Sequence, residues 1–163
     1  VLRLPSEAAP ALGAGSDGTS AVAWVEPGSP PGAGIGLFDG TGKLQWRTGL
    51  RGPGHRLAVL SDQTVVVAVG KDIVALRQGQ VLWRRTVPDL AAGLAGTGTG
   101  QVLVALPNRL FCLGPGGATA WELAPRGRTV GLRAGPEGSW VVLIESDGAE
   151  LFQLPEARGR DDT

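Results

Sequence analysis

The sequence is poor in the side chains that most often carry chemistry. Its 163 residues include one cysteine, Cys112, and one histidine, His55, and they include no methionine and no tyrosine. A single cysteine excludes a disulfide within the chain. No His/Cys cluster is available for zinc, and any Ser/His/Asp or Cys/His arrangement would have to use His55. We therefore expect no catalytic residues and no metal site.

The sequence also lacks a net charge and a long apolar run. Fifteen basic residues balance fifteen acidic ones, so the chain as a whole has no general attraction to nucleic acid or to acidic membranes. A nucleic-acid partner is not expected. No run of 18 apolar residues is present, so no membrane-spanning helix is expected. Because the chain begins at Val1, we expect a processed product from which any targeting segment has been removed.

Glycine and proline are abundant, and they separate short apolar segments. The 27 glycines and 12 prolines interrupt almost every window that could hold a helix, which predicts an all-β protein. The most apolar segments, such as Thr64–Val69 and Gln101–Leu106, do not alternate with polar residues. A strand that alternates is covered on one face, whereas a continuous apolar strand is covered on both.

Three tryptophans mark an internal repeat. Trp46, Trp83 and Trp121 follow one another at intervals of 37 and 38 residues, and each follows a glycine by four residues. The three glycines are Gly42, Gly79 and Gly117. A fixed period of this length indicates a repeat architecture. Four-stranded antiparallel sheets buried on both faces, one per period, are typical of β-propeller blades. A β-sandwich and a β-solenoid are the alternatives.

The repeat divides the chain into four units of about 38 residues, which form either half of a ring or a small ring. We place a single domain at residues 1–155 and a polar tail at 156–163. The units span about 6–48, 49–86, 87–124 and 125–155, and the last has only three strands. Residues 1–5 are predicted to be its fourth strand, because propellers avoid an unpaired edge in this way.

The segment Leu37–Trp46, LFDGTGKLQW, resembles the repeat of the pyrroloquinoline-quinone-type (quinoprotein-like) β-propellers. That repeat has an aspartate, a Thr-Gly turn and a tryptophan at this spacing. The resemblance implies that Trp46, Trp83 and Trp121, with Gly42, Gly79 and Gly117, dock each blade against its neighbour. Unit four lacks a docking tryptophan. Rings of this family usually have seven or eight blades. By that resemblance, the four units are half of a ring that a second copy completes as a homodimer, a small ring, or a fragment.

The resemblance also includes a class of enzymes, the quinoprotein dehydrogenases. These enzymes hold a quinone with calcium and often with two adjacent cysteines. This set cannot be placed on a chain with one cysteine. We therefore expect no cofactor and predict a non-enzymatic interaction or assembly module that binds a protein partner. The alternative is a degenerate half-ring that binds a small molecule in its central channel. Proteins of the family that this repeat resembles are usually extracytoplasmic, so the resemblance implies an extracytoplasmic location.

Arginines gather on one predicted face of the propeller. In this topology the loops between blades, and those between second and third strands, share one face. The candidate binding residues there are Arg51, Arg84, Arg85, Arg126 and Arg128, whose forked donors suit carboxylates and phosphates. The simpler interpretation is that they are solvated loop residues. The proline-rich segment from Glu26 to Gly34 is the other candidate recognition element.

Overall fold

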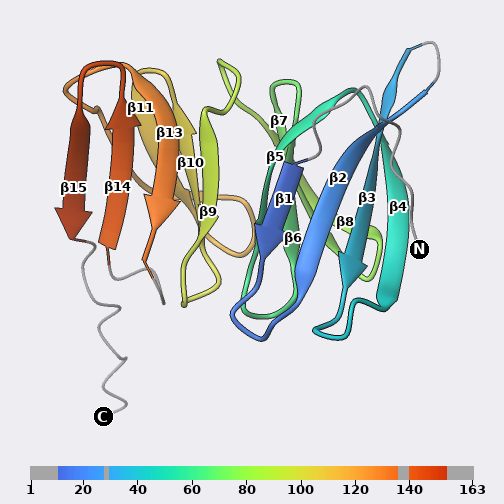
Figure 1. The fold of residues 1–163 in the computed structure, drawn as a ribbon. Coiled ribbons are helices and arrows are strands. Elements are labelled where there is room, and N and C mark those ends of the chain that lie inside the picture. Colours follow the sequence, from blue (N-terminus) through green and yellow to red (C-terminus); the bar gives the residue numbers. More distant parts are fainter. Residues whose placement is uncertain (1–10, 28–29, 136–139, 154–163) are drawn as a thin grey trace.

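The computed structural model describes residues 11–27, 30–135 and 140–153, which form fifteen strands in four antiparallel sheets (Figure 1). Blade 1 contains β1 (Ala11–Ala14), β2 (Ser20–Glu26), β3 (Gly32–Phe38) and β4 (Leu44–Arg51). Blade 2 contains β5 (Gly54–Val59), β6 (Val65–Val69), β7 (Asp72–Arg77) and β8 (Gln80–Thr86). Blade 3 contains β9 (Gly93–Gly96), β10 (Val102–Leu106), β11 (Arg109–Leu113) and β12 (Thr119–Leu123). Blade 4 contains β13 (Thr129–Ala134), β14 (Trp140–Glu145) and β15 (Ala149–Gln153).

These sheets confirm the predicted all-β fold of four antiparallel repeat units. Within each blade, consecutive strands pair in chain order. One boundary differs: β4 runs to Arg51, beyond the predicted end of unit one at 48, because β3 begins at Gly32 and pairs with Arg51. The predicted closing strand, 1–5, and the predicted tail, 156–163, lie outside the described residues. No helix in the described part of the chain could cross a membrane.

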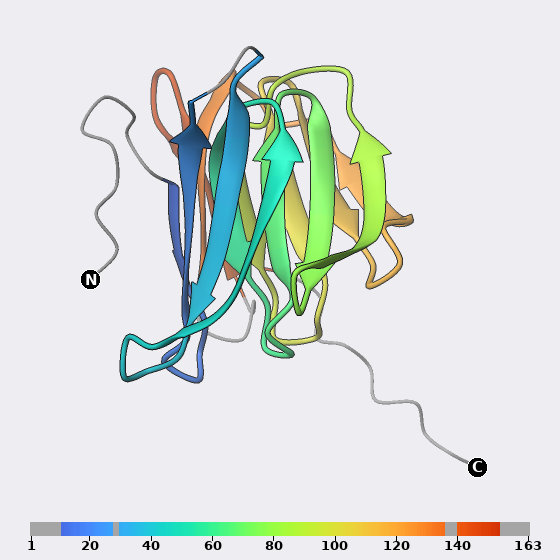
Figure 2. The same ribbon diagram turned by 90° about the vertical axis from the view of Figure 1, so that its right-hand side faces the viewer.

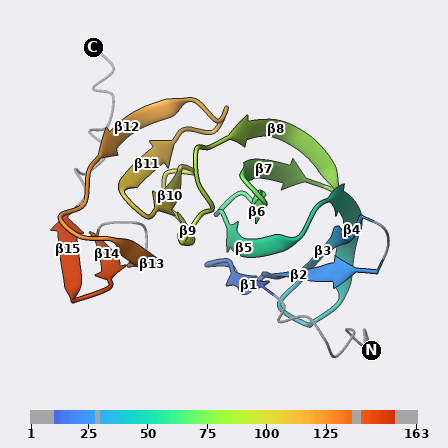
Figure 3. The ribbon, with the colours of Figure 1, turned by 90° about the horizontal axis from the view of Figure 1, so that it is seen from above.

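The four blades fan around a common centre. Seen from above, β1, β5, β9 and β13 lie innermost, and blades 1 and 4 stand at the two ends of the fan (Figure 3). Neighbouring inner strands contact one another in the order β1, β5, β9, β13. Of the two predicted arrangements, the described residues form an open part of a ring and not a closed small ring (Figure 3).

The core consists of three apolar layers, one between each pair of adjacent blades. In β6, Val65, Val67 and Val69 pack toward blade 1, while Val66 and Ala68 pack toward blade 3. Side chains alternate along a strand, so this uniformly apolar strand has a covered surface on both faces. The sequence pattern of residues 64–69 thus has its physical cause in the position of β6 inside the stack.

Glycines and two glutamines, Gln63 and Gln78, have positive φ in the tight turns at the lower end of the blades. Gly42, Gly79 and Gly117, in the turns between the third and fourth strands, have φ values of 80°, 79° and 80°. A Cβ makes this left-handed region unfavourable, which is why glycine occupies it. The upper and lower loops lie at opposite ends of the strands (Figure 2).

Candidate functional site

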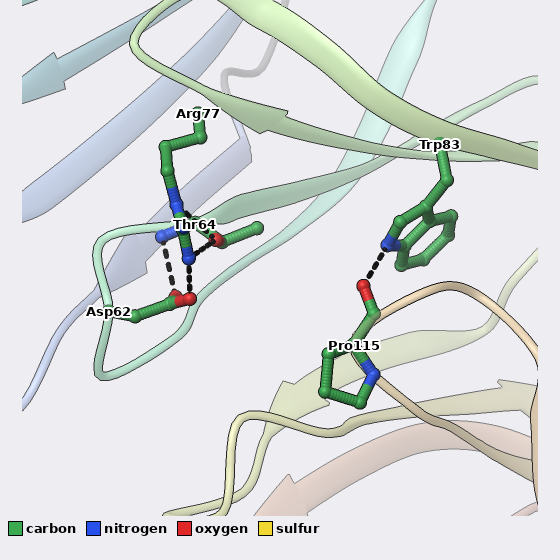
Figure 4. A network of polar contacts seen from close by, with 5 residues as sticks. All are labelled: Asp62, Thr64, Arg77, Trp83 and Pro115. Atoms are coloured by element: carbon green, nitrogen blue, oxygen red, sulfur yellow. Dashed lines mark hydrogen bonds and ion pairs between the residues drawn. The ribbon is translucent and has the colours of Figure 1, made fainter.

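The joint between blades 2 and 3 is built around Trp83. Its indole Nε1 donates a hydrogen bond of 2.7 Å to the carbonyl oxygen of Pro115, in the turn between β11 and β12 (Figure 4). A Cβ on Gly117 would lie only 2.8 Å from two carbon atoms of the same indole. The glycine therefore makes room for the tryptophan, and together they connect the fourth strand of one blade to the turn of the next.

A looser contact between a tryptophan and a turn glycine is present between blades 1 and 2. The Trp46 indole packs on the apolar layer between these blades, and its Cε3 would lie 3.8 Å from a Cβ on Gly79. Trp121 is half-buried and packs on the layer between blades 3 and 4. The turn that would receive it follows β15, outside the described residues. Gly42 belongs to the first blade, and nothing lies within 4 Å of a Cβ placed there.

Arg85 does not lie on the predicted arginine rim. Its guanidinium donates a 3.0 Å hydrogen bond to the carbonyl oxygen of Gly117, and its Cζ lies 5.9 Å from the centre of the Phe111 ring. Arg85 follows Trp83 by two residues in β8, so both side chains point to the same face of the sheet. The structure therefore places Arg85 in the joint between blades 2 and 3. This alternation was the signal in the sequence that could have placed it there.

Of the other four arginines, two are paired with acidic groups. Arg84 pairs with Asp72 at 3.3 Å, and Arg126 pairs with Glu150 at 3.3 Å. Arg51, at the end of β4, and Arg128, in the loop before β13, are exposed. Within the described ranges neither of these two forms an ion pair. The upper face therefore carries both signs of charge.

The upper loops contain prolines and are joined by backbone hydrogen bonds. The amide of Gly70 donates to the carbonyl of Pro53, and the amide of Thr129 donates to that of Pro107. Lys71 adds a side-chain bond of 2.7 Å from Nζ to the carbonyl of Pro88. Proline fixes its own φ, and these bonds connect separate loops. The upper loop face, defined as residues 52–53, 70–71, 87–92, 107–108, 124–128 and 146–148, is thus cross-linked by hydrogen bonds.

Two tryptophans outside the repeat lie on the end faces of the fan. Trp24 covers Gly34, where a Cβ would overlap its indole, and only 5 % of it is exposed. Arg47 lies over the Trp24 rings at 5.0 Å and pairs with Glu26 at 2.6 Å. Trp140 similarly covers Gly135 in blade 4. Sequence analysis missed both roles, although glycines at every second position of β3 were a signal of a side chain lying across that strand.

The two groups best suited to acid–base or nucleophilic chemistry lie in different blades. Desolvation by burial, together with the nearby Arg56 charge, lowers the pKa of His55. Cys112 is fully buried in β11, and its burial raises the thiol pKa to about 11. A thiol with such a pKa is a poor nucleophile near neutral pH. Across the described ranges, no three His, Cys, Asp or Glu side chains are grouped so as to hold a metal ion.

The inner strands line two adjoining hollows on the concave side of the fan. The lower hollow, of about 870 Å³, is bounded mainly by small residues and includes Ser16, Ser61 and Thr97. The upper hollow, of about 580 Å³, includes His55, Arg56 and Arg133. The Arg56 guanidinium also donates to the carbonyl of Ala92, 2.9 Å away in blade 3. The centre of the fan is therefore basic at its upper end.

Comparison with known proteins agrees with this geometry. Residues 31–89, which include the Trp46–Gly79 joint, match the family model described as outer membrane protein assembly factor BamB. The matched segment therefore has the pattern of a pyrroloquinoline-quinone-type β-propeller repeat. No curated protein matches the chain in sequence.

Solved propeller structures share the fold of this repeat protein at low identity. Hydrazine synthase from Kuenenia stuttgartiensis is 14% identical with a TM-score of 0.68, over 94% of this chain and 48% of that chain. BamB from Moraxella catarrhalis is 19% identical with a TM-score of 0.59, over 80% of this chain and 42% of that one. The dihydro-heme d1 dehydrogenase NirN is 20% identical with a TM-score of 0.70, over 94% and 36%. The repeat chain thus spans less than half of each of these three proteins, and the similarity establishes the fold alone.

Proposed function

We propose that the protein is a non-enzymatic interaction or assembly module, which binds another macromolecule through its upper loop face. The observation that carries this proposal is the set of proline-containing loops held by hydrogen bonds such as Gly70 to Pro53 and Thr129 to Pro107. A surface that is already ordered loses little conformational entropy when a partner binds. Leu90, exposed in the loop before β9, offers an apolar contact among the charges of this face.

The placement of the reactive groups supports a non-enzymatic role. Cys112 is enclosed in blade 3, with its Sγ 3.4 Å from Oε1 of Gln101, whereas His55 belongs to blade 2. A nucleophile and its base need to be within hydrogen-bonding reach of each other. Cys112 and His55 therefore form no nucleophile–base pair.

The experiment is site-specific photo-crosslinking in the cells that produce the protein. A photoreactive amino acid replaces Leu90 on the upper face, and the matched control replaces Thr99, which is exposed in the lower turn between β9 and β10. We expect one discrete adduct from position 90 and none from position 99. Adducts of equal yield at both positions, or none at position 90, would contradict binding through the upper face.

A charge-reversal pair refines this experiment. Arg128→Glu changes an exposed residue of the upper loop face, and Arg51→Glu changes an exposed residue next to it, at the end of β4. For neither arginine does the described structure show an ion pair. If the partner is anionic, this double variant should lower the adduct yield from position 90, and the loss should diminish at high salt because exposed charges are screened. Arg85 is unsuitable for this purpose, since its substitution would disturb the joint with Gly117.

We also propose an extracytoplasmic location and a role in assembly. The support is the description of the family matched by residues 31–89, an outer membrane protein assembly factor. Cell fractionation with antibody detection tests the location. A protein found only with cytoplasmic markers would reject both parts of this proposal, while leaving binding through the upper face open to the crosslinking experiment.

The central hollows support a second candidate function, the binding of a small anionic molecule. Arg56 and Arg133 both line the upper hollow, and the residues that line it include no acidic side chain. Clustered guanidinium groups favour carboxylates and phosphates. Calorimetric titration with a dicarboxylate should give saturable binding that Arg133→Gln weakens. An absence of saturable heat in the wild-type protein would remove this candidate.

A further inference from the structure

The upper hollow holds the single histidine of the chain beside an arginine. His55 and Arg56 follow each other in β5, and both line the hollow. Consecutive residues of a regular strand point to opposite faces. Here β5 pairs with β6, and the register shifts between Gly54 and Arg56, which makes His55 the extra residue of a β-bulge. A bulge re-aims side chains, so an imidazole and a guanidinium reach the same hollow.

Backbone carbonyl groups hold the two guanidinium groups of this hollow. The Nε of Arg56 donates to the carbonyl oxygen of Ala92 at 2.9 Å, and its Nη1 donates to that of His55 at 2.8 Å. The Nη1 of Arg133 donates to the carbonyl oxygen of Leu132 at 2.9 Å. Among the described residues, neither arginine forms an ion pair. A guanidinium has five N–H donors, so each arginine keeps donors for an anion.

The His55 imidazole is enclosed next to this charge. Its Nε2 is buried and has no hydrogen-bond partner among the described residues. Desolvation lowers the pKa of His55, the Arg56 charge lowers it further, and the backbone of Pro53 and Ala91 offsets part of the change. The ring is therefore mostly neutral at neutral pH, and repulsion from Arg56 is part of the cost of protonating it.

The strands around β5 add little charge near His55. β5 pairs with β6 and contacts β1, β2, β3 and β9. Of these strands, β1, β3, β6 and β9 contain no charged residue. The exception, β2, ends on Glu26, which pairs with Arg47 of blade 1 at 2.6 Å. In the described ranges, no strand packed on β5 therefore supplies a free carboxylate to His55.

The loops above the hollow carry two further charges. Asp89, in the loop between β8 and β9, is exposed, and the Nζ of Lys71 donates to the carbonyl oxygen of Pro88. Exposed charges are screened by salt, whereas the Arg56 charge acts on His55 inside the hollow. Arg56 is therefore the charge that most opposes protonation of His55.

An anion held by Arg56 would cancel this repulsion without touching the imidazole. The anion would then raise the pKa of His55 toward its ordinary value. Linkage is reciprocal, so a proton on His55 strengthens anion binding by the same factor by which the anion strengthens proton binding. The affinity for the anion consequently rises as the pH falls through the pKa of His55 and declines as the pH returns to neutral.

We propose that anion binding in the upper hollow is coupled to a proton on His55, so that the hollow holds an anion tightly in mild acid and releases it near neutral pH. This coupling rests on the second candidate function, the binding of a small anionic molecule, and it regulates that same site. Two fixed guanidinium groups are present at every pH, and His55 adds a third positive charge only in acid.

The single histidine makes the proton directly measurable. An NMR titration of the His55 Cε1 proton against pH, with and without saturating oxalate, gives the pKa in both states. Oxalate is a dicarboxylate that keeps both charges between about pH 5.5 and about pH 7.5. We expect oxalate to raise the pKa of His55 by about one unit, which corresponds to about a tenfold change in affinity. An unchanged pKa at saturating oxalate overturns the coupling.

Calorimetric titration with oxalate at both ends of this pH range measures the same coupling from the ligand's side. The wild-type protein should bind about tenfold more tightly at the lower pH, and His55→Gln should bind equally at both. Arg133→Gln is the matched control, because it removes a charge from the hollow and leaves His55 beside Arg56. This control should bind more weakly at both pH values and keep the pH dependence. A pH dependence that persists in His55→Gln overturns the assignment to His55.

The two levels of inference fail differently in this experiment. An absence of saturable heat at either pH would remove the candidate function, and the coupling with it. Saturable binding of equal strength at both pH values would leave the candidate function standing and overturn the coupling alone.

Discussion

The joint between blades 2 and 3 and the two end faces use the same residue in different ways. Trp83 reaches across a joint to Pro115 and lies on Gly117 of the next blade. Trp24 and Trp140 instead lie on glycines of their own blades, Gly34 and Gly135. A tryptophan inside the stack connects two blades, whereas a tryptophan at an end covers the sheet to which it belongs. The comparison shows that the repeated residues form the contacts between blades, whereas the outer sheet faces of blades 1 and 4 are covered by tryptophans outside the repeat.

The two ends differ from each other as well. Trp24 is almost completely covered, because the Arg47 guanidinium lies over it and pairs with Glu26. Trp140 remains 39% exposed, beside exposed Ile144 and Leu151. The outer tryptophan of blade 1 is thus shielded by side chains of its own blade, whereas the outer tryptophan of blade 4 stays partly exposed to solvent beside other exposed apolar side chains. Contiguous exposed apolar surface commonly marks an interaction site.

The largest effect is expected from tryptophan truncation at the joint. Trp83→Ala removes a hydrogen bond and the packing on Gly117, so it should lower the free energy of unfolding by about 3–5 kcal/mol. Trp140→Ala removes a partly exposed side chain at an end face and should cost about 1 kcal/mol. Urea denaturation of both variants measures the difference. Equal losses would show that the joint has no special energetic role.

A smaller loss of unfolding free energy is expected when Trp24, which covers the outer face of blade 1, is displaced. A Cβ on Gly34 would overlap the Trp24 indole, so Gly34→Val must displace Trp24 and its Arg47 contact. Overpacking of this kind costs about 1–3 kcal/mol. Gly116→Val is the control, because nothing lies within 4 Å of a Cβ at Gly116. Red-shifted tryptophan fluorescence in Gly34→Val alone would report the displacement, and an unchanged spectrum would count against it.

The periodic parts of this protein were predictable from the sequence, and the unique parts were not. Trp46 and Trp83 recur because each lies on the glycine of the next blade's turn, whereas the turn that would receive Trp121 lies outside the described residues. The uniformly apolar strand at 64–69 follows from burial on both faces. Each end face occurs only once, so no period marks Trp24 or Trp140. Arg85 was assigned to a rim although its spacing of two residues from Trp83 put both on one face of β8; its hydrogen bond to Gly117 depends on how the two sheets stack. The arginine rim itself remains a prediction.

A matched pair of glycine substitutions isolates the contact at the joint. Gly117 and Gly42 both have φ of 80°, so an alanine at either position has a similar backbone cost of about 1–2 kcal/mol. Only at Gly117 does the new Cβ meet an indole, at 2.8 Å from Trp83. Gly117→Ala should therefore be less stable than Gly42→Ala by about 1 kcal/mol. In a Trp83→Ala background, this difference should disappear if the indole is its cause.

The smallest effect on stability concerns two aspartates: Asp17, which contacts blade 2, and Asp39, which lies in a turn of blade 1. The Thr41 hydroxyl and the Lys43 amide lower the pKa of Asp39 below 3.8. The pKa of Asp17 is lowered chiefly by Thr19, and also by Gln63 of blade 2, whose amide lies 3.1 Å away. A carboxyl group with a lower pKa in the folded state binds fewer protons there, so its contribution is present above pH 3.8 and is lost as the pH falls through the folded pKa.

Removal of the Gln63 side chain therefore distinguishes the two sites. Gln63→Ala should lower the melting temperature slightly at neutral pH, and the difference from wild type should diminish as the pH falls below 3.8 through the lowered pKa of Asp17 in the folded state. The matched change Gln45→Ala removes the corresponding donor to Asp39, which lies within blade 1 at 2.7 Å. Only Gln63→Ala breaks a contact between blades, so only this variant should also speed hydrogen exchange of the Thr19 and Thr64 amides together. Faster exchange at Thr19 alone would mean that the bond between Asp17 and Gln63 does not couple the two blades.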